Sequence, residues 1–284
     1  MTTENYKFDQ FKNIKITFIN MPLRESAMPN TPPEGPGILA AIARQYGAKP
    51  HILDLNAYRI KDEESAKRGL MNGRHLTHEE VENLLIKHLD NNGDQDIIAL
   101  SGKITTLRWQ EMVSRMARKH QPDCFLVSGN GLATEIRHGL FNWIPELDAI
   151  GRSEGDNIIL AILNDVKTIK EIGKMKAFKS DKFKADSVEQ YPDKIRFCYE
   201  GDRPRNLDLI PYAAWDLLES DPYGHNILED YIKVPVWGIA ANNSSAAPFT
   251  MKRSLTTVSS RGCPYACSFC YRGAQGERNY GMRS

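Results

Sequence analysis

The sequence has no long apolar run, no excess of charge of one sign and few cysteines. No stretch approaches the ~18 apolar residues that a membrane-spanning helix needs, and the first residues, MTTENYKFDQFKNIK, include no apolar core of a signal peptide. We therefore expect a cytoplasmic protein without a membrane span. Lys and Arg number 37 and Asp and Glu 36, a formal net charge of +1, so the basic footprint of a nucleic-acid-binding protein is missing.

Internal repeats and low-complexity tracts are absent as well. The composition is that of an ordinary globular protein. With 284 residues, 41% hydrophobic and 26% charged, the chain can form at least one substantial core in one or two domains. Partners must therefore be inferred from individual sites.

The five cysteines are an odd number, and three of them lie between Cys263 and Cys270. In a cytosolic protein such a close group favours a metal site over disulfides. Cys124 and Cys198 stand in apolar, strand-like surroundings, so we expect both to be buried as small hydrophobic residues.

From residue 14 to about residue 165, short apolar runs alternate with segments of helical period. This alternation is typical of strands and helices in a parallel sheet. It predicts an α/β domain over residues 1–165, with a doubly wound, mostly parallel, Rossmann-like sheet of five strands. The predicted strands are Ile14–Asn20, His51–Leu55, Asp96–Ser101, Cys124–Ser128 and Asp148–Ile150.

Three predicted helices lie between these strands, each with apolar residues three and four positions apart on one face. Thr77 and Glu80 predict a capping box at the start of the second helix. The three apolar faces consist of Leu39, Ile42, Ala43 and Tyr46, of Val81, Leu84, Leu85 and Leu89, and of Trp109, Met112, Val113 and Met116.

Glycines and hydroxyl groups follow the last three predicted strands, in the loops SGKITT, GNGLAT and GRSEGD. In doubly wound sheets, ligands bind beyond the carboxyl ends of the strands, where glycine lets the backbone come close and Ser or Thr can bond polar edges. The loops are therefore candidates for a ligand site. The alternative is that the glycines only begin tight turns from strand to helix.

Residues 166–245 differ in composition from the region before them. Eight lysines lie between Lys167 and Lys194 among few large apolar residues, which predicts a solvated linker rather than a specific anion-binding patch. The segment LDLIPYAAWDLL follows, and a strand is then predicted over Ser254–Ser260, directly before the cysteines.

Cys263, Cys267 and Cys270 have the spacing C-x3-C-x2-C, which lets one loop present three thiolates to three corners of a cubane iron–sulfur cluster. The fourth iron would be open to the amino and carboxylate groups of S-adenosylmethionine. A structural zinc site is an alternative, but it needs four ligands, and the nearest upstream histidine is His225. A redox disulfide between Cys267 and Cys270 is another alternative that leaves Cys263 unexplained.

The segment SRGCPYACSFC resembles the signature of the radical SAM superfamily. The upstream sequence resembles the cobalamin-binding domain fused to many of these enzymes, in NMPLRESAMPNTPPEGPGILAAIARQYGAKPHILDLNAYR and in the three loops SGKITT, SGNGLAT and GRSEGD. NLDLIPYAAWDLL is similar to the segment that commonly joins the two domains. The similarity spans most of residues 14–270.

This resemblance implies three cofactors: a [4Fe-4S] cluster, S-adenosylmethionine and cobalamin. Cys263, Cys267 and Cys270 would bind iron, and Phe269 would lie near the adenine of the nucleoside. With less specific sequence support, it implies a set of cobalamin contacts. These are Ser101, Gly102, Thr105, Gly129, Gly131 and Glu154.

The resemblance also implies an activity. The expected enzyme cleaves S-adenosylmethionine reductively and uses the radical on a small-molecule substrate, with methyl transfer to an unactivated carbon as the first candidate and a rearrangement or cyclisation as the others. A low-potential electron donor such as flavodoxin or ferredoxin would be its partner. The alternative is a cobalamin- or nucleotide-binding module whose cysteine loop is not catalytic.

Two departures from the family pattern refine these expectations. The motif D-x-H-x-x-G, which supplies a histidine to cobalt in many cobalamin proteins, is absent, so we expect no histidine on the cobalt. Residues 246–284 have room only for the first strand and the cluster loop of a radical SAM partial barrel, because one strand–helix unit takes ~30 residues or more. We therefore expect the chain to be a truncated part of a longer enzyme.

Overall fold

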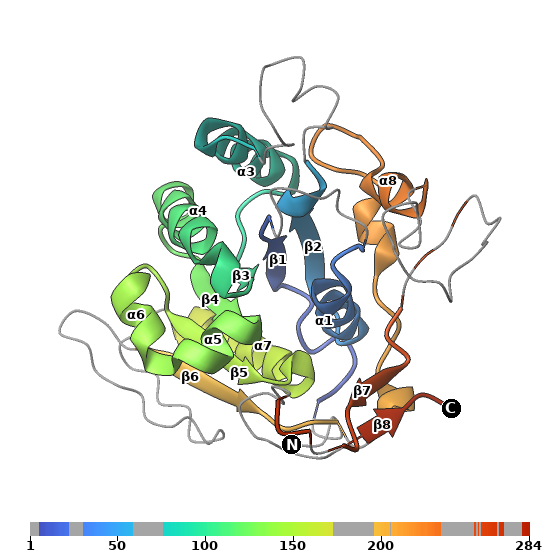
Figure 1. Cartoon of the computed structure of the whole chain (residues 1–284). Coiled ribbons are helices and arrows are strands. Elements are labelled where there is room, and N and C mark those ends of the chain that lie inside the picture. Colours follow the sequence, from blue (N-terminus) through green and yellow to red (C-terminus); the bar gives the residue numbers. More distant parts are fainter. Residues whose placement is uncertain are drawn as a thin grey trace.

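Six parallel strands form a single sheet at the centre of the molecule, in the order β2-β1-β3-β4-β5-β6 (Figure 1). The structure is a computed structural model that describes residues 6–22, 31–58, 76–172, 196–204, 206–233, 253, 255, 257–265, 267–269 and 280–284. The strands are β1 Lys15–Asn20, β2 Lys49–Asp54, β3 Ile97–Ser101, β4 Phe125–Gly129, β5 Ala149–Ser153 and β6 Phe197–Gly201. The strand order changes direction between β1 and β3, as in other doubly wound sheets.

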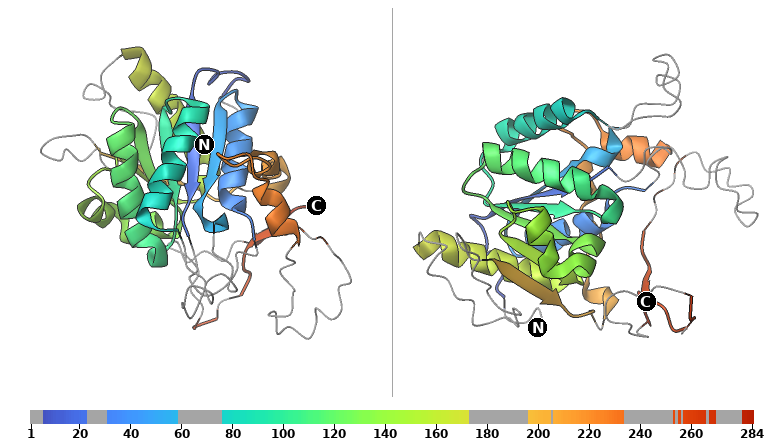
Figure 2. Two further views of the ribbon diagram at one scale, coloured as in Figure 1. Left: turned by 90° about the horizontal axis from the view of Figure 1, so that it is seen from above. Right: turned by 60° about the vertical axis from the view of Figure 1, so that its left-hand side comes forward.

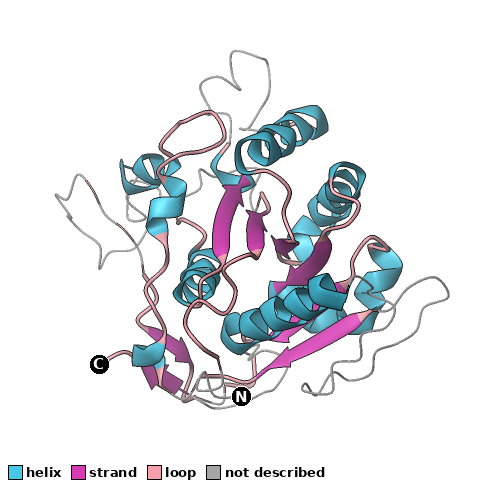
Figure 3. Ribbon diagram, turned by 180° about the vertical axis from the view of Figure 1, so that it is seen from behind, coloured by secondary structure: helices cyan, strands magenta, loops and turns pink. Residues whose placement is uncertain are grey.

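Helices cover both faces of this sheet (Figures 2 and 3). Helices α1 and α7 pack on one face, and α3, α4, α5 and α6 pack on the other. The helices are α1 Glu34–Gln45, α3 His78–Asn92, α4 Leu107–His120, α5 Asn130–Ile136, α6 Leu140–Trp143, α7 Gly155–Ile172 and α8 Ile227–Lys233. Short 3-10 helices are η2 Leu55–Ala57, η3 Ile104–Thr106, η4 Arg137–Gly139, η6 Leu207–Leu209 and η7 Trp215–Leu218. The predicted doubly wound α/β fold is confirmed.

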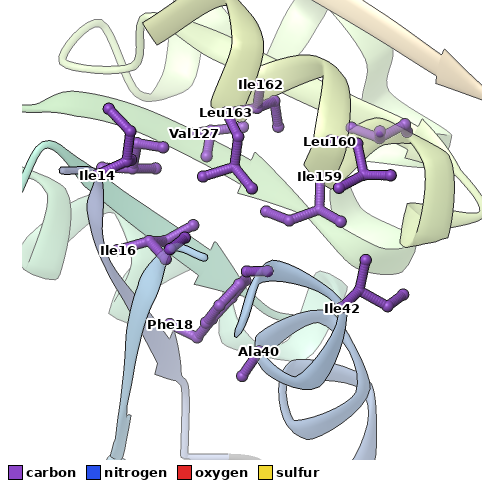
Figure 4. Packing of buried hydrophobic residues seen from close by; sticks show 14 of the residues in the cluster. Ile14, Ile16, Phe18, Ala40, Ile42, Val127, Ile159, Leu160, Ile162 and Leu163 are labelled. Carbon is purple, nitrogen blue, oxygen red and sulfur yellow. The ribbon is translucent and has the colours of Figure 1, made fainter. Parts of the chain in front are cut away.

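Side chains on β1 alternate between two hydrophobic cores, as the pleat of a strand requires. Ile16 and Phe18 pack against α1 and α7 (Figure 4), whereas Ile19 belongs to the core beneath α3 and α4. Burying an aliphatic or aromatic side chain of this size contributes ~1.5–3 kcal/mol. The two cores therefore fix the sheet from both sides and hold its carboxyl edge in place.

Three local predictions are confirmed. The Thr77 hydroxyl accepts from the Glu80 backbone N–H at 3.2 Å, and the Thr77 N–H donates to the Glu80 carboxylate at 2.6 Å, which completes the capping box. Cys124 and Cys198 are free and buried. Burial raises the pKa of Cys124 to about 12, so its thiol stays neutral.

The sheet has one strand more than the sequence predicted. Strand β6 lies within residues 166–245, the predicted linker, and pairs with β5 from Ala149 and Phe197 to Ser153 and Gly201. The sequence did not predict this strand because its short run FCYEG follows the lysine-rich segment and has no clear strand pattern. Its place at the edge of the sheet, beside β5, orders it. The lysine-rich residues themselves fall mainly outside the described residues.

The later part of the predicted linker packs on the sheet domain. The Ala214 N–H donates to the Gly37 carbonyl of α1 at 3.0 Å, and the Tyr231 hydroxyl of α8 donates to Asp54 at the end of β2 at 2.6 Å. Residues 206–233 are therefore part of the same body as the sheet.

The C-terminal segment forms a small antiparallel ribbon, β7 Ser260–Gly262 with β8 Tyr280–Met282. A strand was predicted over Ser254–Ser260. Of the described residues in this range, only Ser260 is in a strand, so the prediction is wrong for residues 255 and 257–259. The strand begins at Ser260, because its partner β8 offers only three pairing residues. In the part of the chain that the structure describes, no helix is long and apolar enough to cross a membrane.

Candidate functional site

A cavity of about 330 Å³ lies at the carboxyl edge of the sheet, between the ends of β3, β4 and β5 and the helices α1 and α7. Its walls are mostly aliphatic. The side chains on these walls include Ile38 and Leu39 from α1 and Ile158, Ile159 and Ile162 from α7. An apolar cavity with a few polar groups at its rim is the usual form of a site for an organic ligand.

Two glycines keep the cavity open where β4 and β5 end. Gly129 and Gly151 both line it, and a Cβ atom added to Gly129 would have no neighbour closer than the Gly151 carbonyl oxygen at 4.0 Å. Position 129 therefore has room for a Cβ atom beside the cavity.

A hydrogen-bonded rim connects the ends of three strands. Asn130 donates from its side chain to the Ser101 hydroxyl at 3.2 Å, and the Thr134 hydroxyl donates to the Asn130 carbonyl at 3.0 Å. The Ser153 N–H donates to the Thr134 hydroxyl at 3.0 Å. Asn130 and Ser153 have φ of 70° and 67°, a left-handed conformation that costs a non-glycine residue of order 1–3 kcal/mol and is concentrated at functional sites.

Three of the six predicted cobalamin contacts, Ser101, Gly129 and Glu154, line this cavity. Thr105 is exposed outside it, and Gly131 lies on the exposed surface of α5. Gly102 is buried against α4, where an added Cβ atom would overlap the Thr106 hydroxyl, so its lack of a side chain serves packing there.

Five further polar residues that line the cavity were not among the predicted contacts: Glu34, Asn130, Ser153, Asp156 and Arg261. Asn130 had a local signal, since asparagine between two glycines after a strand favours the left-handed conformation. Ser153 and Asp156 lie in the predicted candidate loop GRSEGD, whereas Glu34 and Arg261 had no local signal, because their roles depend on contacts between distant parts of the chain.

Glu154 faces two arginines. Its carboxylate lies 3.4 Å from the Arg203 Nε atom and 2.9 Å from an Arg261 nitrogen. Its backbone is crowded as well, because a Cβ atom on Gly201 would overlap the Glu154 carbonyl oxygen. Glu154 is thus fixed at the end of β5 by β6 and by the C-terminal segment.

The segment that precedes Cys263 covers one side of the cavity. Val258 and Arg261 line the cavity, and Glu34, in the first turn of α1, accepts from the Thr257 hydroxyl at 2.9 Å and from the Val258 N–H at 2.7 Å. The start of the cysteine loop is therefore attached directly to the rim of the cavity.

The described part of the cysteine loop presents its groups to solvent. Cys263 and Cys267 are free and exposed, and Phe269 is 91% exposed. Cys270 lies outside the described residues. Among the residues described, no three His, Cys, Asp or Glu side chains are grouped to hold a metal ion.

No protein-family model matches the sequence. A solved structure of the cobalamin-dependent S-adenosylmethionine radical enzyme OxsB, with aqua-cobalamin and S-adenosylmethionine bound, superposes with a TM-score of 0.58 and 17% identity. The superposition covers 96% of this chain and 30% of that enzyme. The two chains share a fold.

The sequence is also similar to the uncharacterized methyltransferase PH0819 of Pyrococcus horikoshii. The two are 24% identical over 184 residues, which is 64% of this chain and 32% of the methyltransferase. The chain therefore spans about a third of the length of each of these two proteins.

Proposed function

We propose that the chain is the cobalamin-binding part and the cluster loop of a radical SAM enzyme, which transfers a methyl group to an unactivated carbon of a small molecule. The observation that carries this proposal is the apolar cavity whose rim includes the segment leading into Cys263. Support comes from the shared fold with OxsB, named as a cobalamin-dependent radical enzyme, and from the similarity to a methyltransferase.

The cavity suits one part of cobalamin. Its volume is too small for the corrin ring, but a flat aromatic base such as the benzimidazole of the nucleotide tail matches aliphatic walls from α1 and α7 and a glycine-lined opening at Gly129 and Gly151. Ser101 and Asn130 at the rim would bond polar edges of the tail. Because the sequence has no D-x-H-x-x-G motif, we expect no protein imidazole on the cobalt, and nitrogen coupling in the Co(II) spectrum would contradict this.

The cysteine loop suits an iron–sulfur cluster in its donor chemistry. Cys263 and Cys267 are free thiols that solvent reaches, and three cysteines at this spacing can hold three irons of a cubane. A bound cluster would supply the electron that cleaves S-adenosylmethionine, and cobalamin would supply the methyl group. In this proposal the chain holds both groups near one another, and a flavodoxin- or ferredoxin-like protein donates the electron.

The test is a titration of the full chain with cobalamin, followed by absorbance, for the wild type and for Gly129→Leu. Gly129 lines the cavity and has room for a Cβ atom, so we expect leucine there to take up ligand space and to lower the affinity at least a hundredfold while the fold persists. Asn83→Leu is the control, since it adds the same side chain at an exposed position of α3, on the face of the sheet opposite α1 and α7. Equal affinity of all three proteins, or no binding by the wild type, would contradict the proposal.

A further inference from the structure

An ion-pair cluster connects the C-terminal segment to the start of α7. It consists of Arg261, Glu154 and Asp156. One terminal nitrogen of Arg261 lies 2.6 Å from Asp156 Oδ2 and 2.9 Å from Glu154 Oε2, and the other lies 3.2 Å from Asp156 Oδ1. The planar guanidinium thus holds both oxygens of one carboxylate and one oxygen of the second, a geometry that lysine cannot reproduce.

The cluster is partly buried, so its pairs are less screened than those on an open surface. The exposed fraction of the side chain is 19% for Arg261, 24% for Glu154 and 8% for Asp156. Asp156 also lies in the first turn of α7, where the helix dipole favours a negative charge. The two carboxylates therefore belong to the sheet domain, and Arg261 is the partner that the C-terminal segment contributes.

The position of Arg261 in the chain gives the cluster its significance. Arg261 is the central residue of β7 and is followed after one residue by Cys263, so the cysteine backbone lies within ~7 Å of it along an extended chain. On the other side, Glu34 holds Thr257 and Val258. Residues 257–262 are thus fixed to α1 at one end and to α7 at the other, along the side of the cavity that Val258 and Arg261 line.

We propose that Arg261 is a positioning residue, whose ion pairs with Glu154 and Asp156 close residues 257–262 over the cavity and so set where the cysteine loop begins. A ligand in the cavity would lie beneath this segment and would leave only when the pairs break. What the cavity and the loop bind rests on the proposed function; the closure itself does not.

The test is hydrogen exchange of residues 257–262 in the full chain, measured by mass spectrometry. Arg261→Gln should raise their exchange rate about tenfold or more, since it leaves two fixed carboxylates without their common partner, and Arg261→Lys should give an intermediate rate. The double variant Arg261→Gln/Asp156→Asn should exchange no faster than Arg261→Gln alone. The matched control is Arg44→Gln, because the Arg44 pair with Asp216 joins two elements but is more exposed, at 43% and 56%.

Wild-type exchange in Arg261→Gln, or faster exchange in the double variant than in Arg261→Gln alone, would overturn the proposal. A second measurement is the release of bound cobalamin, which Arg261→Gln should accelerate about tenfold and Arg44→Gln should not. An unchanged release rate would overturn closure over the ligand. If the wild type binds no cobalamin, the proposed function fails, and the exchange rates still decide whether Arg261 holds the segment.

Discussion

The buried side chain of His88 has a hydrogen-bond partner at each ring nitrogen, and these partners indicate its protonation state. The Thr17 hydroxyl donates to Gln95 at 3.1 Å, so it accepts from the His88 Nε2–H at 2.9 Å. The Asn92 amide faces the other ring nitrogen at 3.4 Å as a donor. This arrangement suits the neutral ring, and burial, with His51 nearby, lowers the pKa of His88 from 6.5 to about 4.

We expect the free energy of unfolding to fall as the pH is lowered from about 6.5 to 4. In this window the unfolded chain takes up a proton at His88 and the folded chain does not, so acid favours unfolding, by up to about 3 kcal/mol. Urea denaturation at several pH values measures this. His88→Gln should show a weaker dependence on pH over the same window, and an identical dependence would rule out His88 as its source.

At the scale of elements, helix α8 is attached to the sheet by a polar contact in an apolar setting. Asp54 at the end of β2 is buried, and it accepts from the Asn20 amide at 2.8 Å, the Asn56 N–H at 3.1 Å and the Tyr231 hydroxyl at 2.6 Å. Burial raises the pKa of Asp54 above its usual value, and these hydrogen bonds offset only part of that rise. The carboxyl group therefore depends on its donors, and α8 supplies one of them.

Tyr231→Phe should loosen α8 from the sheet. Removing the hydroxyl leaves the buried Asp54 with one donor fewer, at a cost of about 1–3 kcal/mol, so amide exchange in residues 227–233 should accelerate while β1 and β3 remain protected. Tyr212→Phe is the matched control, since Tyr212 lies in the same segment and is exposed. Equal exchange in the two variants would show that the hydroxyl does not hold α8.

The elements most accessible to sequence reasoning were those with strong periodicity. The five predicted strands rest on short apolar runs, which burial on both faces of a sheet favours, and the three helices rest on apolar residues of helical period. Strand β6 was missed because an edge strand of five residues needs little pattern of its own once β5 is beside it. The cover of the cavity was missed because Arg261 and Asp156 are 105 positions apart, and Glu34 and Val258 224 apart.

At the scale of the whole molecule, the sheet domain brings together the two sites of the proposed function, the cavity for cobalamin and the cysteine loop for the cluster. The apolar cavity lies at the carboxyl edge of the sheet, and the cysteine loop begins at its rim. The segment over residues 206–233 packs on the same domain, and Arg283 of the C-terminal ribbon donates to the Ile210 carbonyl at 2.8 Å. The segment that leads into the cysteine loop is therefore attached to α1 and α7, and the ribbon that it forms is attached to residues 206–233.

The measurement that tests the central claim most directly is the iron and cobalt content of the full chain after anaerobic reconstitution with iron, sulfide and cobalamin and removal of unbound metal. We predict about four irons and one cobalt per chain, as three thiolates on one loop and one cavity imply. Replacing Cys263, Cys267 and Cys270 together with Ala should abolish the iron and leave the cobalt. A wild type that retains neither metal, or a triple variant that retains the same iron, would contradict the account.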